Sequence, residues 1–199
     1  MKLNWAERWV VNNPLRVFQQ RLEIKWFKRA MSLEPGATVV EIGCGRGAGA
    51  KLILKEFQPS LLHILDLDMK MMINAKKYLF STPKEQVKLY VGDSINLPFK
   101  TDAVDAVFGF GFLHHVPDWR RALSEIARVL KGGGIYYMEE LYPTLYQNVV
   151  TKHILFHPDH DRFNRRDLRT MLDEMDLRLA SAIELPKMGV LGVSVHSDQ

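Results

Sequence analysis

The sequence has little cysteine and no long apolar stretch. Its single cysteine, Cys44, excludes an internal disulfide framework and an all-cysteine zinc cage, and is compatible with a reducing compartment. The longest run without a charged side chain, Ala106 to Pro117, is well short of the roughly 18 residues that a membrane span needs. Because Lys2, Glu7 and Arg8 interrupt the start of the chain, we predict no secretory signal and expect a cytoplasmic protein.

Repeats, low-complexity tracts and long linkers are also missing, so we predict one domain over residues 1–199. Apolar residues make up 47% and charged residues 25% of the chain, values that exclude disordered and fibrous classes. The 27 basic and 23 acidic side chains give a net charge of +4. Because the two signs are interleaved, the charge is weak support for nucleic-acid binding, and we expect no nucleic-acid partner.

The pattern of apolar residues predicts first a helix and then alternating strands and helices. Asn13 and Pro14 open the helix and Pro35-Gly36 ends it. We interpret its apolar residues at helical spacing as a core face. They are Phe18, Leu22, Trp26, Ala30 and Leu33.

The predicted strands are 38–42, 61–66, 87–91, 103–109 and 135–140, and the helices between them are 48–57, 69–80 and 118–131. A turn at Gly132-Gly133-Gly134 ends the last of these helices. Such alternation implies a parallel sheet covered on both faces. A further helix starts at Asn164, and strands 177–184 and 190–196 predict an antiparallel hairpin at one edge. The fold class is therefore α/β, with a seven-stranded, mostly parallel sheet.

A glycine-rich loop follows the first strand. Gly43, Gly45 and Gly47 allow close approach of a ligand to the backbone, and the next helix offers unpaired N–H groups at its start. We therefore predict a nucleotide-like ligand. The loop also satisfies a dinucleotide fingerprint if Ala48 is counted, so a nicotinamide cofactor stays open. The other alternative is that the glycines serve only packing in the turn.

An acidic residue ends the second strand. Asp66 lies 19 residues after Gly47, a spacing that suits a carboxylate accepting hydrogen bonds from ribose hydroxyls. Asp68 is the competitor, but it directly precedes a helical pattern and is better explained as a helix N-cap.

Five stretches in order resemble the motifs of class I S-adenosylmethionine-dependent methyltransferases. They are Glu41–Gly47, Leu65–Asp68, Gly92–Ser94 with Leu97-Pro98-Phe99, Val104–Val107 with Leu113–Val116, and Arg128–Gly134. The resemblance covers roughly residues 36–140 and is closest to the subgroup with the ubiquinone and menaquinone biosynthesis methyltransferases. It implies a Rossmann-like sheet with helices on both faces and S-adenosyl-L-methionine as the cofactor.

The same resemblance implies which residues bind that cofactor. Glu41 would hold its methionine end, Asp66 its ribose and Asp93 its adenine amine; the alternative for Asp93 is a turn residue. The full implied set is Glu41, Gly43, Cys44, Gly45, Gly47, Asp66, Leu67, Asp93, Ser94, Gly109 and Phe110.

The catalytic residues are open. A general base is needed only when the acceptor must lose a proton, and His114 and His115 are the candidates at the exit of the fourth strand. The alternative that we favour is a hydrogen-bonded structural pair. We predict no metal site, because Pro158 interrupts the histidine cluster around His153, His157 and His160.

The parts outside the core (36–140) should select the acceptor: an N-terminal helical lid (1–35) and a segment over 141–163, while 164–199 forms a helix and the closing hairpin. We expect a small, apolar or aromatic acceptor. Trp5 and Trp9, four residues apart, are candidates for a lid or a membrane-surface contact. The alternatives are an RNA or protein methyltransferase, a nicotinamide-dependent oxidoreductase and a non-catalytic cofactor-binding subunit.

Overall fold

The computed structural model describes residues 13–146 and 162–197. The strands are β1 (Thr38–Ile42), β2 (Leu61–Asp66), β3 (Val87–Val91), β4 (Val104–Phe110), β5 (Leu130–Leu141), β6 (Leu177–Leu185) and β7 (Gly189–His196). The helices are α2 (Pro14–Ala30), α3 (Ala48–Phe57), α4 (Met69–Tyr78), the 3-10 turn η1 (Leu113–His115), α5 (Trp119–Val129), α6 (Pro143–Tyr146) and α7 (Arg165–Glu174). In these two ranges no helix is both long and apolar enough to cross a membrane.

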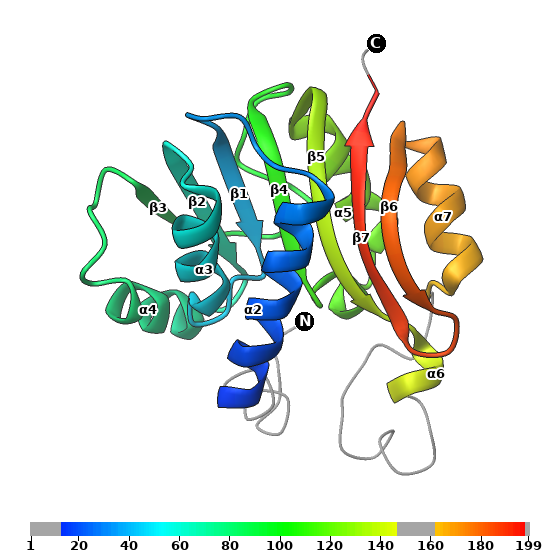
Figure 1. Ribbon diagram of the computed structural model, residues 1–199, viewed down its shortest axis with the longest axis horizontal. Coiled ribbons are helices and arrows are strands. Elements are labelled where there is room, and N and C mark those ends of the chain that lie inside the picture. Colours follow the sequence, from blue (N-terminus) through cyan, green and yellow to red (C-terminus); the bar gives the residue numbers. More distant parts are fainter. Residues whose placement is uncertain (1–12, 147–161, 198–199) are drawn as a thin grey trace.

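The seven strands form one sheet in the order β3-β2-β1-β4-β5-β7-β6 (Figure 1). The first five are parallel to one another, whereas β7 runs antiparallel to both β5 and β6. This arrangement confirms the predicted fold class, including the hairpin at one edge. The order reverses between β1 and β4, and ligands of open α/β sheets bind at such a switch point.

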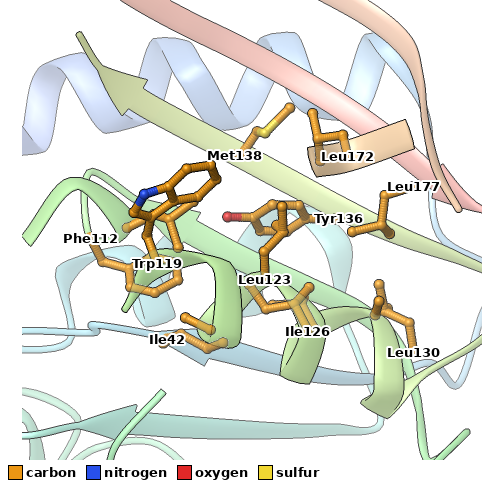
Figure 2. Close-up of a cluster of buried hydrophobic side chains, with 14 of the residues drawn as sticks. Ile42, Phe112, Trp119, Leu123, Ile126, Leu130, Tyr136, Met138, Leu172 and Leu177 are labelled. Carbon is orange, nitrogen blue, oxygen red and sulfur yellow. The ribbon is translucent and has the colours of Figure 1, made fainter. Parts of the chain in front are cut away.

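Helices cover both faces of the sheet, and each face has its own core. Side chains of α2, α3 and α4 pack on one face, where Phe27 and Ile53 are fully buried. The other face carries α5 and α7, with Trp119 and Leu123 inside the cluster drawn in Figure 2. Trp119, Leu123 and Ile126 of α5 recur every three or four residues and are buried, so this side of the helix is a core face.

The glycine-rich stretch 132–134 lies inside β5, which differs from the prediction. The helix ends earlier, at Val129, and the strand already begins at Leu130. Leu130 pairs with Val104 and Ile135 pairs with Ala106, so the residues between them, including all three glycines, bulge out opposite a single residue of β4. Extra residues on one strand leave the ladder in this way without ending it.

Helix α2 begins where predicted, but it ends at Ala30 and not at Pro35-Gly36, and its orientation differs from the prediction. The Asn13 side chain accepts a hydrogen bond from the N–H of Leu15 and caps the helix. The predicted core positions Phe18 and Leu22 are wrong, because 59% and 55% of these residues are exposed. Ile24 and Phe27 are the buried apolar residues instead, while Trp26 is half-buried against the same core.

Candidate active site

A cavity of about 380 Å³ lies at the carboxyl ends of the parallel strands. Its volume is in the range of small-molecule sites. The loop after β1, the ends of β2 and β4, the turn after β3, helix α2 and the segment around η1 all contribute to its wall. Eight of the eleven predicted cofactor-binding residues line it: Gly43, Cys44, Gly45, Asp66, Leu67, Asp93, Ser94 and Phe110.

The glycine loop holds its shape through backbone contacts with β2. The N–H groups of Gly43 and Cys44 donate to the carbonyl oxygen of Leu65 at 2.8 and 3.2 Å. Gly43 has a φ of +70°, and a Cβ there would lie 2.7 Å from the Cβ of Phe112. Only glycine combines this backbone conformation with the close approach of an aromatic side chain.

Asp66 sits at the end of β2 and faces the same loop. Its Oδ2 accepts a hydrogen bond from the N–H of Gly45 at 2.9 Å, and its Oδ1 accepts one from the N–H of Asp68 at 2.8 Å. Burial raises the pKa of Asp66, although these two backbone amides oppose the shift. Each carboxylate oxygen keeps a further lone pair, so the group is held in place and can still accept from a ligand.

Asp68 has the role that its place in the sequence predicts. Its side chain accepts a hydrogen bond from the N–H of Lys70 at 2.9 Å and caps α4. Asp68 also lines the cavity, one position beyond Leu67. The structure therefore separates the two acids by geometry, with Asp66 turned to the glycine loop and Asp68 to the helix.

Glu41 lies behind the cavity, not on its surface. It is 2% exposed, and its Oε2 is buried without a hydrogen-bond partner in the part of the chain that the structure describes. Burial, and then the charge of Asp66, raise the pKa of Glu41 well above its ordinary value, against a hydrogen bond with the backbone of Ala50. The carboxyl group is thus a buried acceptor next to the loop.

Two other predicted residues, Gly47 and Gly109, do not reach the cavity wall. Gly47 is the N-cap position of α3 with a φ of +83°, and it packs near Leu79 of the α4 end. Gly109 lies within β4, where a Cβ would meet the ring of Phe112 at 2.5 Å. Both positions need glycine for the shape of the site.

Asp93 and Ser94 follow β3 and form the wall of the cavity beyond Leu67. Asp93 Oδ1 accepts from the N–H of Ile95 at 3.3 Å, which gives it the turn role as well. Ser94 is buried, whereas Leu67 is 41% exposed at the cavity rim. The cavity wall therefore has both an apolar side chain, Leu67, and an acidic one, Asp93.

The two candidate histidines have different surroundings. His114 is 5% exposed, and its Nδ1 lies 2.8 Å from Oε2 of the fully buried Glu140. The N–H groups of Leu113 and His114 also donate to this carboxylate. His115 lines the cavity, and its ring centroid is 4.3 Å from that of His114. His114 is therefore part of a structural pair, and His115 is the histidine that a bound acceptor could meet.

Helix α2 brings to the cavity an arginine that belongs to none of the predicted motifs. Arg16 lines the wall beside Gln20 and donates to Glu139 Oε2 at 2.6 Å and to Glu23 Oε1 at 3.0 Å. Burial, and then the charge of Glu139, raise the pKa of Glu23 to about 7, although Arg16 opposes the shift. Glu139 is 123 positions away from Arg16, so no local pattern could reveal this contact.

Several predicted residues lie outside the described residues. These are Trp5, Trp9, His153, His157 and His160.

Taken together, the fold and the cavity define a class. A parallel sheet carries a glycine loop at its switch point, with an acidic residue at the end of the neighbouring strand. This combination defines an α/β protein that binds a nucleoside cofactor.

The family described as a methyltransferase domain matches residues 40–138, about half of the chain. The chain belongs to the class I S-adenosylmethionine-dependent methyltransferases. The glycine loop alone left a nicotinamide cofactor open, and this membership decides for S-adenosylmethionine.

Known relatives are similar over the same region. Phosphoethanolamine N-methyltransferase 2 of Caenorhabditis elegans is 32% identical over 111 residues, which are 56% of this chain and 25% of that protein. The demethylmenaquinone methyltransferase of Desulfitobacterium hafniense strain Y51 is 32% identical over 136 residues, 65% of this chain and 53% of that protein. The chain therefore spans about half or less of the length of these curated relatives.

A solved structure with a similar fold is that of a putative methyltransferase in complex with the Haloferax volcanii Trm112 methyltransferase activator. It has a TM-score of 0.73 and 23% sequence identity, and the match covers 98% of this chain and 95% of that one. At this identity the similarity concerns the fold alone.

Proposed function

We propose that this chain transfers a methyl group from S-adenosylmethionine to a small, apolar or aromatic acceptor. The observation that carries the proposal is the composition of the cavity wall. The wall combines the glycine loop, Asp66 and Asp93 with the apolar side chains of Ile95 and Phe112. The glycine and acidic residues suit the cofactor, and the apolar side chains suit an acceptor without charge.

The residues present suit the cofactor. It has two ribose hydroxyls, an ammonium group and a planar adenine. Asp66 can accept from the hydroxyls, and Asp93 from the adenine amine. The buried Oε2 of Glu41 has no protein partner in the described part of the chain, and we propose it as the acceptor for the methionine end. These roles would place the cofactor along the loop.

The bound cofactor supplies a methyl group on a positively charged sulfonium, which is already reactive. The chain's own residues mainly orient the acceptor and exclude water. Phe112, which lines the cavity, would contact the face of a planar acceptor, while Phe110 would border the methionine end of the cofactor. His115 would accept a proton from an acceptor that must lose one, and Arg16 and Gln20 of α2 would close the cavity on its other side.

The names of the relatives support more than one acceptor. One relative acts on phosphoethanolamine and another on demethylmenaquinone. We favour the aromatic type, because Arg16 is already engaged by two carboxylates and is not available to bind a phosphate. Trp5 and Trp9 are proposed to contact the acceptor or a membrane surface.

The test is formation of S-adenosylhomocysteine by the full chain with three acceptors: a soluble hydroquinone, phosphoethanolamine and bulk RNA. Turnover with the hydroquinone, lost in Asp66→Ala, supports the proposal. Turnover with RNA alone would point to the RNA methyltransferase alternative. Tight binding of S-adenosylhomocysteine without turnover of any acceptor would favour the non-catalytic subunit.

A further inference from the structure

Helix α2 has more apolar surface than its contact with the core uses. Its inward side carries the buried Ile24 and Phe27. A second apolar row lies on the opposite side at spacings of three and four residues, and we call it the outer stripe. It consists of Leu15, Phe18 and Leu22, which are 74%, 59% and 55% exposed.

Cations flank this stripe on the same helix. Arg21, Lys25 and Arg29 are exposed, and no described residue forms a salt bridge or side-chain hydrogen bond with them; we call them the basic flank. A fourth cation, Lys28, contacts Glu56 of α3. The one acidic residue of α2, Glu23, is turned inward to Arg16. The outer face of α2 therefore combines apolar side chains with uncompensated positive charge.

A helix with an apolar row beside lysines and arginines is the arrangement that lies in the interface of an anionic lipid layer. The apolar side chains leave water for the acyl boundary, while the cations meet the phosphates. We propose that the outer face of α2 docks the protein on an anionic lipid surface.

The position of α2 gives this contact a use. Its first turns extend past the carboxyl ends of β1 and β4 (Figure 1), and its inward side supplies Arg16 and Gln20 to the cavity wall. The helix therefore lies between the proposed lipid surface and the cavity. An apolar acceptor partitions into lipid, so docking would bring the cavity close to the acceptor. This use of the lipid contact rests on the proposed function, whereas the docking itself does not.

The experiment is vesicle co-sedimentation of the full chain, with phosphatidylcholine vesicles and with vesicles that contain phosphatidylglycerol. We expect binding to the anionic vesicles that weakens with salt, because exposed charges are screened. Phe18→Glu/Leu22→Glu should lower the partition coefficient by about tenfold or more. Lys25→Gln/Arg29→Gln should lower it by about fivefold for each cation removed.

The matched control is Ile183→Glu/Leu185→Glu on β6. These two residues are 52% and 53% exposed, and the variant adds the same negative charge at a distant place. It should bind vesicles like the wild type. Equal binding by the α2 variant and this control would overturn the proposal, as would binding that does not distinguish the two vesicle types.

Two further measurements test whether something other than lipid occupies the outer face of α2. If Trp5→Ala/Trp9→Ala abolishes vesicle binding and the α2 variant does not, the N-terminal aromatic residues make the contact and the proposal is wrong. If the α2 variant changes only the sedimentation coefficient, the face is an interface between two copies, which also overturns it. Binding of S-adenosylhomocysteine, measured in parallel, tests the proposed function separately and should be unchanged in every variant.

Discussion

Gly49 leaves the space in which the carboxyl group of Glu41 lies. A Cβ at position 49 would overlap Glu41 Oε1 and would come within 3.2 Å of the Phe110 ring. Gly49 is the second residue of α3, so the helix begins against the acid at the end of β1. The start of this helix and the buried carboxyl group therefore fit only together.

Gly49→Ala should destabilise the fold by about 1–3 kcal/mol, the usual cost of overpacking. It should also weaken binding of S-adenosylhomocysteine, because Glu41 must move. In a Glu41→Ala background most of the added cost should disappear, since the overlapping group is gone. Urea unfolding of both single variants and the double variant measures this coupling, and additive effects would contradict it.

Asp66→Ala should weaken binding of S-adenosylhomocysteine by on the order of 1–3 kcal/mol, because the half-buried carboxylate that we propose as the acceptor for the ribose hydroxyls is lost. Isothermal titration calorimetry measures the change. Asp105→Ala is the matched control. Asp105 accepts from the N–H of Thr38 and from Lys131 at the opposite end of the sheet, so its removal should lower stability and leave the affinity intact.

Substitutions of the two histidines should affect different properties: catalysis for His115 and stability for His114. His115→Gln should lower kcat by roughly 10²–10⁴-fold with an acceptor that must lose a proton, with little change in cofactor affinity. An unchanged kcat with such an acceptor would remove His115 from catalysis.

His114→Ala should instead cost about 1–3 kcal/mol of stability, because the buried carboxylate of Glu140 loses the imidazole hydrogen bond and keeps only those from the backbone N–H groups of Leu113 and residue 114. Thermal unfolding of the variant checks this value. A Tm equal to that of the wild type would mean that the pair with Glu140 does not stabilise the fold.

Because of Glu23, the free energy of unfolding should decrease as the pH rises. Its pKa is 4.5 in an unfolded chain and about 7 in the fold, so between these values the folded state keeps a proton that the unfolded state releases. The stabilisation is complete below pH 4.5 and is lost as the pH rises through 7.

Between these pH values the free energy of unfolding of the wild type should fall by on the order of 3 kcal/mol because of Glu23, and Glu23→Gln should remove this fall. Urea unfolding across the pH range measures the difference. The exposed Glu34→Gln is the control and should keep the wild-type slope. Parallel profiles for Glu23→Gln and the wild type would contradict the shifted pKa.

Most of the fold could be predicted because its signals are local. The strand β1 and helix α3 have the predicted bounds, since an apolar run and a glycine turn determine them. The start of β5 could not be predicted, because the partner strand β4 decides which residues bulge out. The face of α2 was wrong since both sides of this helix are apolar, and only packing selects Phe27 over Phe18.

The residues of the cavity also divide into those with local signals in the sequence and those placed by distant contacts. Asp66 and Gly43 belong to compact motifs, and the sequence finds them. Arg16 is held at the cavity by Glu23 and by Glu139, and Glu139 is too far away in the chain for a local pattern to reveal it. The sequence also could not distinguish the roles of His114 and His115, because both are histidines and only their surroundings in the fold differ.

Glu139 and Glu140 are neighbours on β5, and successive residues of a strand point to opposite faces of the sheet. Glu139 braces α2 through Arg16, and Glu140 braces η1 through His114. These two adjacent residues of β5 therefore anchor two different walls of the cavity, helix α2 and the η1 segment. A single-residue deletion between Ile135 and Glu139 would exchange the two carboxylates between the faces, so it should detach both walls at once.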